Sequence, residues 1–390
     1  MLFSLSSKNI FEYLVQQGLC TSEDYGPEHI ESKSSKNFNL LVTLKNGQKL
    51  LVKQEACPQK DKVSDEFLND WKIDQFINEF EEVSFLKEIS ARIVSFDHNH
   101  GILVSEYLDE YDDLNDFYDQ GNFFPAQIAA LIGSSLATIH QSTFNNHQHR
   151  DFFCKALSMP EHYYPDKIMR IGPEIFNSIS LDGIQFFVLF QRYESLREAM
   201  IEAIKSFTPC CLVHNDLKPA NILLHTHWED NPEASIIRFI DWEFSTWGDP
   251  AFDLGSLIAN YLKIWLNSLV VSSSISITEA LHLAGTPLEY IQPSMLEVIR
   301  SYLKQFPEIL EAEPQFLKQV MRFSGLVLIQ KIQTSIREKE PFDNTDLCML
   351  QVAKSLLCNP KQSVQTIFGV SESELTGTLV PRTPRTSMAQ

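Results

Sequence analysis

The chain has 390 residues, of which 44% are hydrophobic and 21% are charged, the ordinary balance of a globular protein. At about 150 residues per domain, this length allows two lobes or domains. The formal net charge of −19 argues against a nucleic-acid-binding protein, because neutralising phosphates needs a basic face. The same charge is compatible with a cationic substrate and with an ordinary acidic surface.

The cysteine pattern and the amino terminus favour a cytoplasmic protein. Seven cysteines are present, an odd number without any C-x-x-C spacing, so the sequence predicts neither a disulfide framework nor a zinc site. The first residues lack a basic n-region and are interrupted by Lys8 and Glu12, so we expect no signal peptide. No stretch approaches about 18 uninterrupted apolar residues, and we therefore expect no membrane-spanning helix and no membrane partner.

The amino-terminal part of the chain predicts a helix followed by a hairpin. Apolar residues recur at helical spacing between residues 10 and 15. Further along, Asn46-Gly47 separates two apolar runs, which is the sequence signal of a type I′ hairpin. A two-residue turn at this point would set Leu40 opposite Lys53. Lys53 would then lie beside the mouth of the polar loop 34–39.

The next elements are a helix, a strand and a connector. Residues 65–90 predict one amphipathic helix, because large apolar side chains recur at three- and four-residue steps. Its acidic residues Glu79, Glu81 and Glu82 are also typical of a solvated helix face. The following segment, GILVSEYLDEYDDL (101–114), predicts a buried strand and then an acidic connector.

From Pro125 onward the pattern is helical, with the proline at a favourable first turn. A second helix is expected over about 184–207 and leads into an apolar strand. Another helix begins near Asp253, and residues 276–365 predict further helices separated by polar joints. The tail, 366–390, has no core-forming pattern and is expected to be disordered.

The central segment, residues 210–241, has the pattern of a hairpin with polar residues at its open end. Asp216 and Asn221 follow an apolar run, and two short apolar segments then flank a turn-rich stretch that ends before Asp241. The two segments are 222–224 and 236–239. If they pair antiparallel, Asn221 and Asp241 become neighbours, and Asp216 lies just upstream on a loop. Two oxygen ligands and one free carboxylate suit a Mg²⁺ site with a base beside it, whereas a single such pair would be an ordinary set of turn residues.

The order of these residues resembles the catalytic and metal loops of protein-kinase-like enzymes. The matching residues are His214, Asp216, Asn221 and Asp241. In place of Asp-Phe-Gly the chain has Asp241-Trp242-Glu243, and WGDPAFDLG follows at 247–255. This form is similar to the aminoglycoside phosphotransferase and choline kinase group, whose members phosphorylate small molecules.

Two further positions refine the resemblance. Asn37-Phe38-Asn39 and Val52-Lys53-Gln54 are similar to the methylthioribose kinases, and a Ser/Asn-containing loop often replaces the glycine-rich loop in such enzymes. Asn215 stands where the phosphotransferase group usually has glycine, and Lys218 is commoner in protein kinases.

The resemblance implies a bilobal α+β, protein-kinase-like fold. A small lobe with an antiparallel sheet, residues 1–107, would bind the nucleotide. A mostly helical large lobe, residues 108–365, would carry the catalytic loop, the metal site and the acceptor-binding helices. The implied activity is transfer of the γ-phosphate of ATP, with Mg²⁺, to a hydroxyl of a small molecule such as an aminoglycoside, choline or a sugar-type alcohol.

The resemblance also implies a role for each site residue. Asp216 would accept the hydroxyl proton, Lys218 would neutralise the transferring phosphoryl, and Asn221 and Asp241 would hold Mg²⁺. Asp253 would anchor the catalytic loop through backbone N–H groups. Three groups of residues would bind the nucleotide: a phosphate-orienting lysine with its helix glutamate, the polar loop, and the backbone that bonds adenine. These residues are Lys53, Glu82, Ser35, Asn37, Asn39, Glu106, Tyr107 and Leu108, with Glu79 and Glu81 as rivals of Glu82.

Two other functions stay open. A protein kinase is favoured by Lys218 and opposed by Trp242-Glu243 and by the lack of an Ala-Pro-Glu segment. A kinase-fold binding protein without turnover is opposed by the complete set of candidate site residues. For the acceptor, the acidic connector at 109–116 favours a cation, and the likeness to the methylthioribose kinases favours a neutral alcohol.

Overall fold

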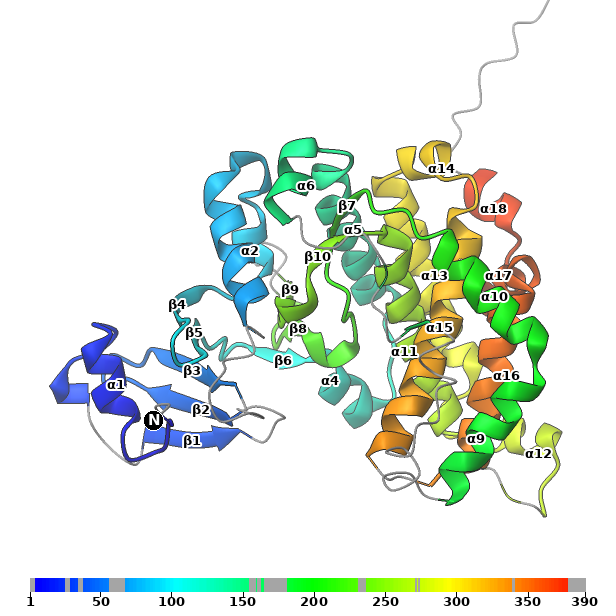
Figure 1. Ribbon diagram of the computed structural model, residues 1–390, viewed down its shortest axis with the longest axis horizontal. Coiled ribbons are helices and arrows are strands. Elements are labelled where there is room, and N and C mark those ends of the chain that lie inside the picture. The colour runs from blue at the N-terminus through cyan, green and yellow to red at the C-terminus, as the bar shows by residue number, and fades with distance from the viewer. Residues whose placement is uncertain are drawn as a thin grey trace, which may run out of the picture. The chain divides into compact units, whose positions relative to one another are not determined.

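A computed structural model, shown in Figure 1, describes most of the chain. The described residues are 4–24, 29–33, 38–55, 67–153, 159, 163–164, 181–230, 236–270, 272, 274–338 and 341–377. Within these ranges, no helix is both long and apolar enough to cross a membrane. The chain divides into two compact units, which are described separately. The first unit comprises Met1–Phe117 and Pro219–Thr246, and the second comprises Tyr118–Lys218 and Trp247–Gln390.

The first unit contains an antiparallel sheet with the strand order β1-β2-β3-β5-β4 (Figure 1). The strands are β1 (Ile30–Lys33), β2 (Phe38–Thr43), β3 (Lys49–Gln54), β4 (Ile93–Asp97) and β5 (Ile102–Glu106). Helix α1 (Ile10–Gln16) forms as expected and buries its apolar stripe in a core shared with this sheet. A 3₁₀ turn, Ser22–Asp24, follows α1.

The hairpin between β2 and β3 differs from the expected type I′ turn. The Leu44 N–H donates to the Gln48 carbonyl at 2.8 Å, and only Gly47 of the intervening residues has a positive φ, +84°. The loop therefore has three residues, and the register moves by one, so that Asn39 rather than Leu40 lies opposite Lys53. This register opposes Leu40 to Val52, both of which face the core, whereas the expected register would pair a core side chain with a lysine.

The single helix expected over 65–90 is instead three short elements. Helix α2 (Leu68–Glu79) ends where Phe80 adopts an extended backbone, with φ −115° and ψ 111°. A 3₁₀ turn (Glu81–Val83) and helix α3 (Leu86–Ile89) follow. Val83 and Leu86, which follow the break, are both buried.

A second, three-stranded sheet of the first unit confirms the expected central hairpin. Its strands are β6 (Tyr111–Asp113), β8 (Ile222–His225) and β9 (Ile237–Phe239), in the order β6-β8-β9. Ile222 lies opposite Phe239, and the Ile240 N–H donates to the Asn221 carbonyl at 3.0 Å. Strand β6 pairs with β8, and the segment Pro219–Thr246 belongs with β6 to the first unit.

The second unit is mostly helical. Its only described sheet has two strands, β7 (Cys211–Val213) and β10 (Thr246–Gly248), which pair with each other. Its helices begin with α4, whose first residues lie in the first unit. They are α4 (Leu114–Gly121), α5 (Ala126–Thr143), α6 (His147–Phe153), α9 (Leu181–Arg192), α10 (Glu194–Lys205), α11 (Pro250–Asn267), α12 (Ile277–His282), α13 (Leu288–Gln305), α14 (Glu308–Ala312), α15 (Phe316–Arg337), α16 (Asn344–Cys358), α17 (Pro360–Phe368) and α18 (Glu372–Gly377).

Two expectations for this unit are corrected. The helix expected over 184–207 is two helices, because Tyr193 between α9 and α10 leaves the helical conformation, with φ −102° and ψ 78°. Disorder was also expected from residue 366, whereas residues 366–377 include the end of α17 and all of α18, with Phe368 and Leu375 buried. Residues 378–390 lie outside the described part.

Helices α11 and α15 pack closely against each other. A Cβ on Gly255 of α11 would lie 2.8 Å from the Cβ of Phe323 and 3.0 Å from the Ser324 nitrogen. The approach of the two helices therefore requires glycine at this position. The α+β architecture, with an amino-terminal antiparallel sheet and a mostly helical remainder, confirms the predicted fold class.

Candidate active site

The first unit contains a cavity of about 290 Å³. Its lining combines charged side chains with apolar ones, among them Leu51, Leu103 and Leu223. Four predicted nucleotide-binding residues contribute to it, and so does one predicted metal ligand. They are Lys53, Glu106, Tyr107, Leu108 and Asp241. The structure thus brings together residues from three separate parts of the sequence.

Lys53 and Asp241 form an ion pair in this cavity. Burial opposes the positive charge of Lys53. The carboxylates around it outweigh this effect and raise the pKa of the Lys53 ammonium above its ordinary value. These carboxylates are Asp241, Asp70 and Glu243. The carboxylates around Lys53 therefore favour its charged form.

Asp70 of α2, which sequence reasoning missed, is a carboxylate whose charge acts on Lys53. Because α2 ends at Glu79, Glu82 lies in the 3₁₀ turn beyond it and is exposed. Asp70 is 8% exposed and lines the cavity. The available signal was its position three residues before Ile73, on the buried stripe of the helix.

Asp70 also holds the loop that carries Asp241. Its Oδ1 accepts a hydrogen bond from the Trp242 N–H at 2.9 Å, and the Asn69 side chain donates to the Glu243 carbonyl at 2.7 Å. Burial raises the pKa of Asp70 to about 7, and the charges of Asp241 and Glu243 add to this effect, while Lys53 and the Trp242 N–H oppose it. The start of α2 and the Asp241 loop therefore form one polar assembly.

Asp241 has an unusual backbone conformation, with φ +59° and ψ 61°. Residues other than glycine rarely adopt this left-handed region unless their surroundings enforce it. A 3₁₀ turn, Trp242–Phe244, follows at once, and the buried Trp242 indole donates to the Phe239 carbonyl at 3.2 Å. This left-handed position lies two residues after Phe239, where β9 ends.

The other predicted residues of the first unit are placed as follows. Asn221 is 2% exposed and ends the 3₁₀ turn Pro219–Asn221, at the same end of the hairpin as Asp241. Asn39 lies on β2 directly opposite Lys53. Ser35 and Asn37 lie outside the described residues.

The candidate base Asp216 lies in the second unit with Lys218. The Lys218 ammonium donates to the Asp216 carboxylate at 2.7 Å, and both side chains are about one-third exposed or less, at 36% and 26%. The Asn260 side chain of α11 donates to the Leu217 carbonyl at 3.1 Å, which supports the loop between them. Lys218 thus orients the Asp216 carboxylate, and Asn260 orients the Leu217 carbonyl.

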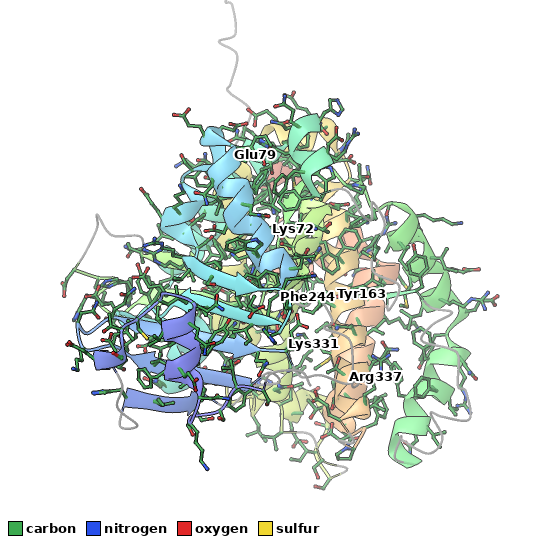
Figure 2. The ribbon with its side chains drawn as sticks, turned by 60° about the vertical axis from the view of Figure 1, so that its left-hand side comes forward. Lys72, Glu79, Tyr163, Phe244, Lys331 and Arg337 are labelled. Atoms are coloured by element: carbon green, nitrogen blue, oxygen red, sulfur yellow. The ribbon has the colours of Figure 1, made fainter. Side chains whose placement is uncertain are left out.

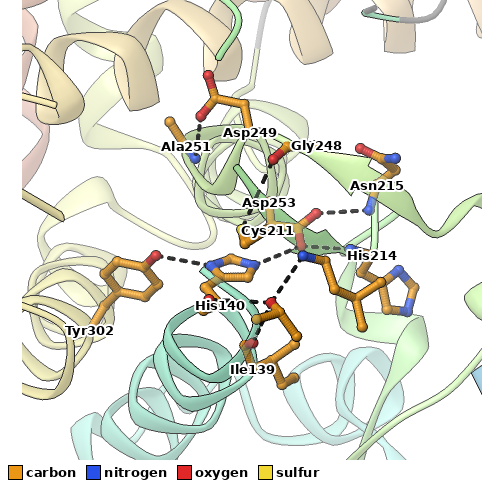
Figure 3. A network of polar contacts seen from close by, with 12 residues as sticks. Ile139, His140, Cys211, His214, Asn215, Gly248, Asp249, Ala251, Asp253 and Tyr302 are labelled. Atoms are coloured by element: carbon orange, nitrogen blue, oxygen red, sulfur yellow. Dashed lines mark hydrogen bonds and ion pairs between the residues drawn. The ribbon is translucent and has the colours of Figure 1, made fainter. Parts of the chain in front are cut away.

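Asp253 anchors this loop, as the resemblance implied (Figure 3). Its carboxylate accepts the His214 N–H at 2.7 Å and the Asn215 N–H at 2.8 Å. His140 contacts the same carboxylate at 3.2 Å through Nε2, and its Nδ1 lies 2.9 Å from the Tyr302 hydroxyl. All of these side chains except Asn215 are buried. Asp253 therefore positions the loop rather than reacting.

Asn215 occupies a left-handed backbone position, with φ +65°. Glycine is favoured there and asparagine is the next best tolerated residue. The departure from the family's usual glycine therefore preserves the local conformation of the loop.

Tyr163 is a neighbour of Asp216 that sequence reasoning missed. It is buried, and its ring packs edge-on against Phe252 with centroids 5.3 Å apart. Burial raises the pKa of the Tyr163 hydroxyl, and the Asp216 charge adds to the effect. Figure 2 shows Tyr163 together with Lys331 of α15, whose charge also interacts with that of Asp216. Neither residue has a sequence signature, because both reach this loop through tertiary packing.

Comparison with known proteins gives a match in sequence and a likeness in fold. A model of the phosphotransferase enzyme family matches residues 177–272, the stretch with the Asp216 loop, the central hairpin and α11. Comparison with curated protein sequences gives no match. The ADP-bound structure of the aminoglycoside phosphotransferase APH(2'')-Ib is similar at 15% identity and a TM-score of 0.51, covering 90% of this chain and 98% of that one. This likeness shows a common fold.

Two kinases of small molecules are similar at lower TM-scores. The choline kinase LicA from Streptococcus pneumoniae is 17% identical, with 90% of this chain and 98% of that chain covered and a TM-score of 0.49. A choline/ethanolamine kinase family protein from Mesorhizobium loti is 13% identical, with 94% and 100% covered and a TM-score of 0.40. Over residues 177–272, the chain is similar in sequence to the phosphotransferase enzyme family.

Proposed function

We propose that the protein transfers the γ-phosphate of ATP to a hydroxyl group of a small molecule. The observation that carries this proposal is the Lys53–Asp241 ion pair in a cavity that is also lined by Glu106, Tyr107 and Leu108. A phosphate-orienting cation and a metal-binding carboxylate beside a partly apolar cavity are the parts that phosphoryl transfer needs.

The cavity fits a nucleotide in its chemistry. Its apolar side chains offer surfaces for a purine ring, and Lys53 offers a charge for phosphate oxygens. APH(2'')-Ib, which has the same fold, binds ADP. ATP is therefore the cofactor that we propose.

Asn221 and Asp241 would hold Mg²⁺, because both provide hard oxygen atoms at one end of the β8–β9 hairpin. Among the described residues, no three His, Cys, Asp or Glu side chains gather as metal ligands. A Mg²⁺ ion here would take its other ligands from phosphate oxygens and water, as is usual for this ion. When bound, it neutralises charge on the phosphates.

Asp216 would orient the acceptor hydroxyl and take its proton. Asp253 and Asn260 hold the loop around Asp216 through its backbone, which leaves the carboxylate in contact with Lys218. Lys218 would leave Asp216 to neutralise the transferring phosphoryl group. In this scheme the protein acts by positioning and charge neutralisation.

The test is an assay of ADP release by the purified protein with Mg²⁺-ATP and a panel of aminoglycosides, choline, homoserine and methylthioribose. We expect at least one alcohol to accelerate ADP release and to be recovered as its phosphate ester. Nucleotide binding without turnover on any acceptor would favour a non-catalytic kinase-fold protein. Phosphorylation of protein substrates alone would favour a protein kinase.

A further inference from the structure

Two lysines of the second unit act on the candidate base Asp216, and a third lies within charge range of one of them. Lys218 is paired with Asp216 at 2.7 Å, while Lys263 of α11 and Lys331 of α15 come from helices that pack against each other. The charge of Lys331 interacts with Asp216, Lys218 and Lys263. The site around the base is therefore cationic, although the chain as a whole carries a net charge of −19.

The packing of α11 and α15 places these two lysines within range of each other's charge. Phe252 and Gly255 of α11 lie against Phe323 and Ser324 of α15. Further along both helices, the charge of Lys263 acts on Lys331, so the helices run parallel. Asn260, which binds the Leu217 carbonyl, lies one turn before Lys263 on the same face of α11. Lys263 is thus directed to the side of α11 that faces the catalytic loop.

The ammonium group of Lys331 has no hydrogen bond or ion pair with any residue that the structure describes. It is nevertheless only partly exposed. Burial lowers the pKa of its ammonium group, Lys263 and Lys218 act in the same direction, and the Asp216 charge opposes them. A desolvated cation beside two further cations is unfavourable unless an anion compensates it. Asp216 cannot serve all three lysines, since it is already bonded to Lys218.

We propose that the acceptor is an anionic alcohol, whose carboxylate or phosphate group binds Lys331 and Lys263 while its hydroxyl reaches Asp216. This proposal rests on the proposed function, of which it names the substrate class. A cationic acceptor would meet two positive charges near the base. The acidic residues Asp112, Asp113 and Asp116, on which a cationic acceptor was argued from the sequence, line the cavity of the first unit instead.

Four alcohols of similar size separate the charge classes: choline, glycerol, glycerate and glycerol 3-phosphate. Their binding is measured by thermal unfolding of the full chain with saturating Mg²⁺-ADP, so that the nucleotide cavity is filled, at constant ionic strength. We expect glycerate or glycerol 3-phosphate to raise the unfolding temperature, and choline and glycerol to leave it unchanged. The two anions distinguish a carboxylate site from a phosphate site.

The variants are Lys331→Gln and Lys263→Gln, with the exposed Lys304→Gln of α13 as the matched control. Each of the first two should weaken anion binding roughly tenfold or more, because each removes a charge-assisted hydrogen bond, and the control should bind normally. Two independent variants protect the test against misfolding of one. The proposal is overturned if neither anion binds, if choline binds better, or if both variants bind anions as the unchanged protein does.

The experiments distinguish failure of the anion site from failure of the phosphotransferase assignment. Anion binding lost in Lys331→Gln, without ADP release on any alcohol, would retain the anion site and reject the phosphotransferase assignment. ADP release with choline that Lys331→Gln leaves unchanged would retain the phosphotransferase assignment and reject the anion site.

Discussion

Asp70 of α2 accepts a hydrogen bond from the backbone N–H of Trp242, and this bond links a helix near the amino terminus to a loop that lies 172 residues later in the chain. The same carboxyl lies within the electrostatic reach of Lys53, Asp241 and Glu243. Its protonation state therefore affects both the stability of the first unit and the charge of the cavity.

Asp70→Asn should change how stability depends on pH. Folding raises the pKa of Asp70 from an ordinary value near 3.8 to about 7, so the folded protein holds this proton more tightly than the unfolded chain does. The contribution of this group to the free energy of unfolding is therefore greatest below about pH 4, falls as pH rises toward 7, and is level above that.

Asparagine keeps an acceptor for the Trp242 N–H and removes the titration. The free energy of unfolding of Asp70→Asn minus that of the unchanged protein should increase between pH 5 and pH 8, by on the order of a few kcal/mol. Urea unfolding without nucleotide or divalent ions measures this difference, with the exposed Asp230→Asn as control. Asp249, whose pKa burial also raises to about 7, contributes equally to both proteins and cancels. A difference independent of pH would contradict the expectation.

Asp216→Asn should abolish phosphoryl transfer and leave ATP affinity nearly unchanged, because Asp216 acts on the acceptor. General-base contributions are about 10²- to 10⁴-fold in rate. The measurements are kcat for the best acceptor and equilibrium binding of a fluorescent ATP analogue. A loss smaller than tenfold in a folded variant would remove Asp216 from the role of base.

Asp241→Ala should lose Mg²⁺-dependent nucleotide binding as well as rate, because it removes a charged metal ligand and the partner of Lys53. Glu243→Ala is the matched control, since Glu243 holds the loop through its backbone carbonyl. Titration calorimetry of ADP with and without Mg²⁺ checks the prediction. Equal Mg²⁺ dependence in Asp241→Ala and the unchanged protein is the result that would refute the metal assignment.

Asn215→Gly should be tolerated, whereas Asn215→Val should lower both stability and activity. The backbone at this position is left-handed, which costs a residue with a Cβ roughly 1–2 kcal/mol and a β-branched residue more. Thermal unfolding and the rate of phosphoryl transfer test the pair together. Equal behaviour of the glycine and valine variants would show that the loop does not depend on this conformation.

The sequence predicted the central hairpin well because its determinants are local. The residues from Asp216 to Asp241 stand close together in the chain, and a turn between two apolar segments brings Asn221 back to Asp241. The leading helix and the fold class followed from patterns of the same kind. Such features need only periodicity and turn chemistry.

The errors all concern tertiary packing. No glycine or proline marks the end of α2 at Phe80, so one helix was expected over 65–90, and Asp70, whose charge acts on Lys53, was overlooked. The Asn46-Gly47 signal fits two turn lengths, and only the pairing of core residues across β2 and β3 selects the longer one. Tyr163 and Lys331 reach the neighbourhood of Asp216 from distant elements, which no local pattern reveals.

The pairing of β6 with β8 has a consequence for how the protein is made. The first unit needs the strand at Tyr111–Asp113 and the hairpin that ends at Phe239, yet the intervening chain builds most of another unit. At about 5–20 residues per second of synthesis, residue 246 follows residue 117 after roughly 6 to 26 s. During this interval β6 presents an unpaired edge. The amino-terminal unit, although it begins first, must therefore be completed after synthesis of the Asp216 loop, and its final strand pairing is a late, long-range step of folding.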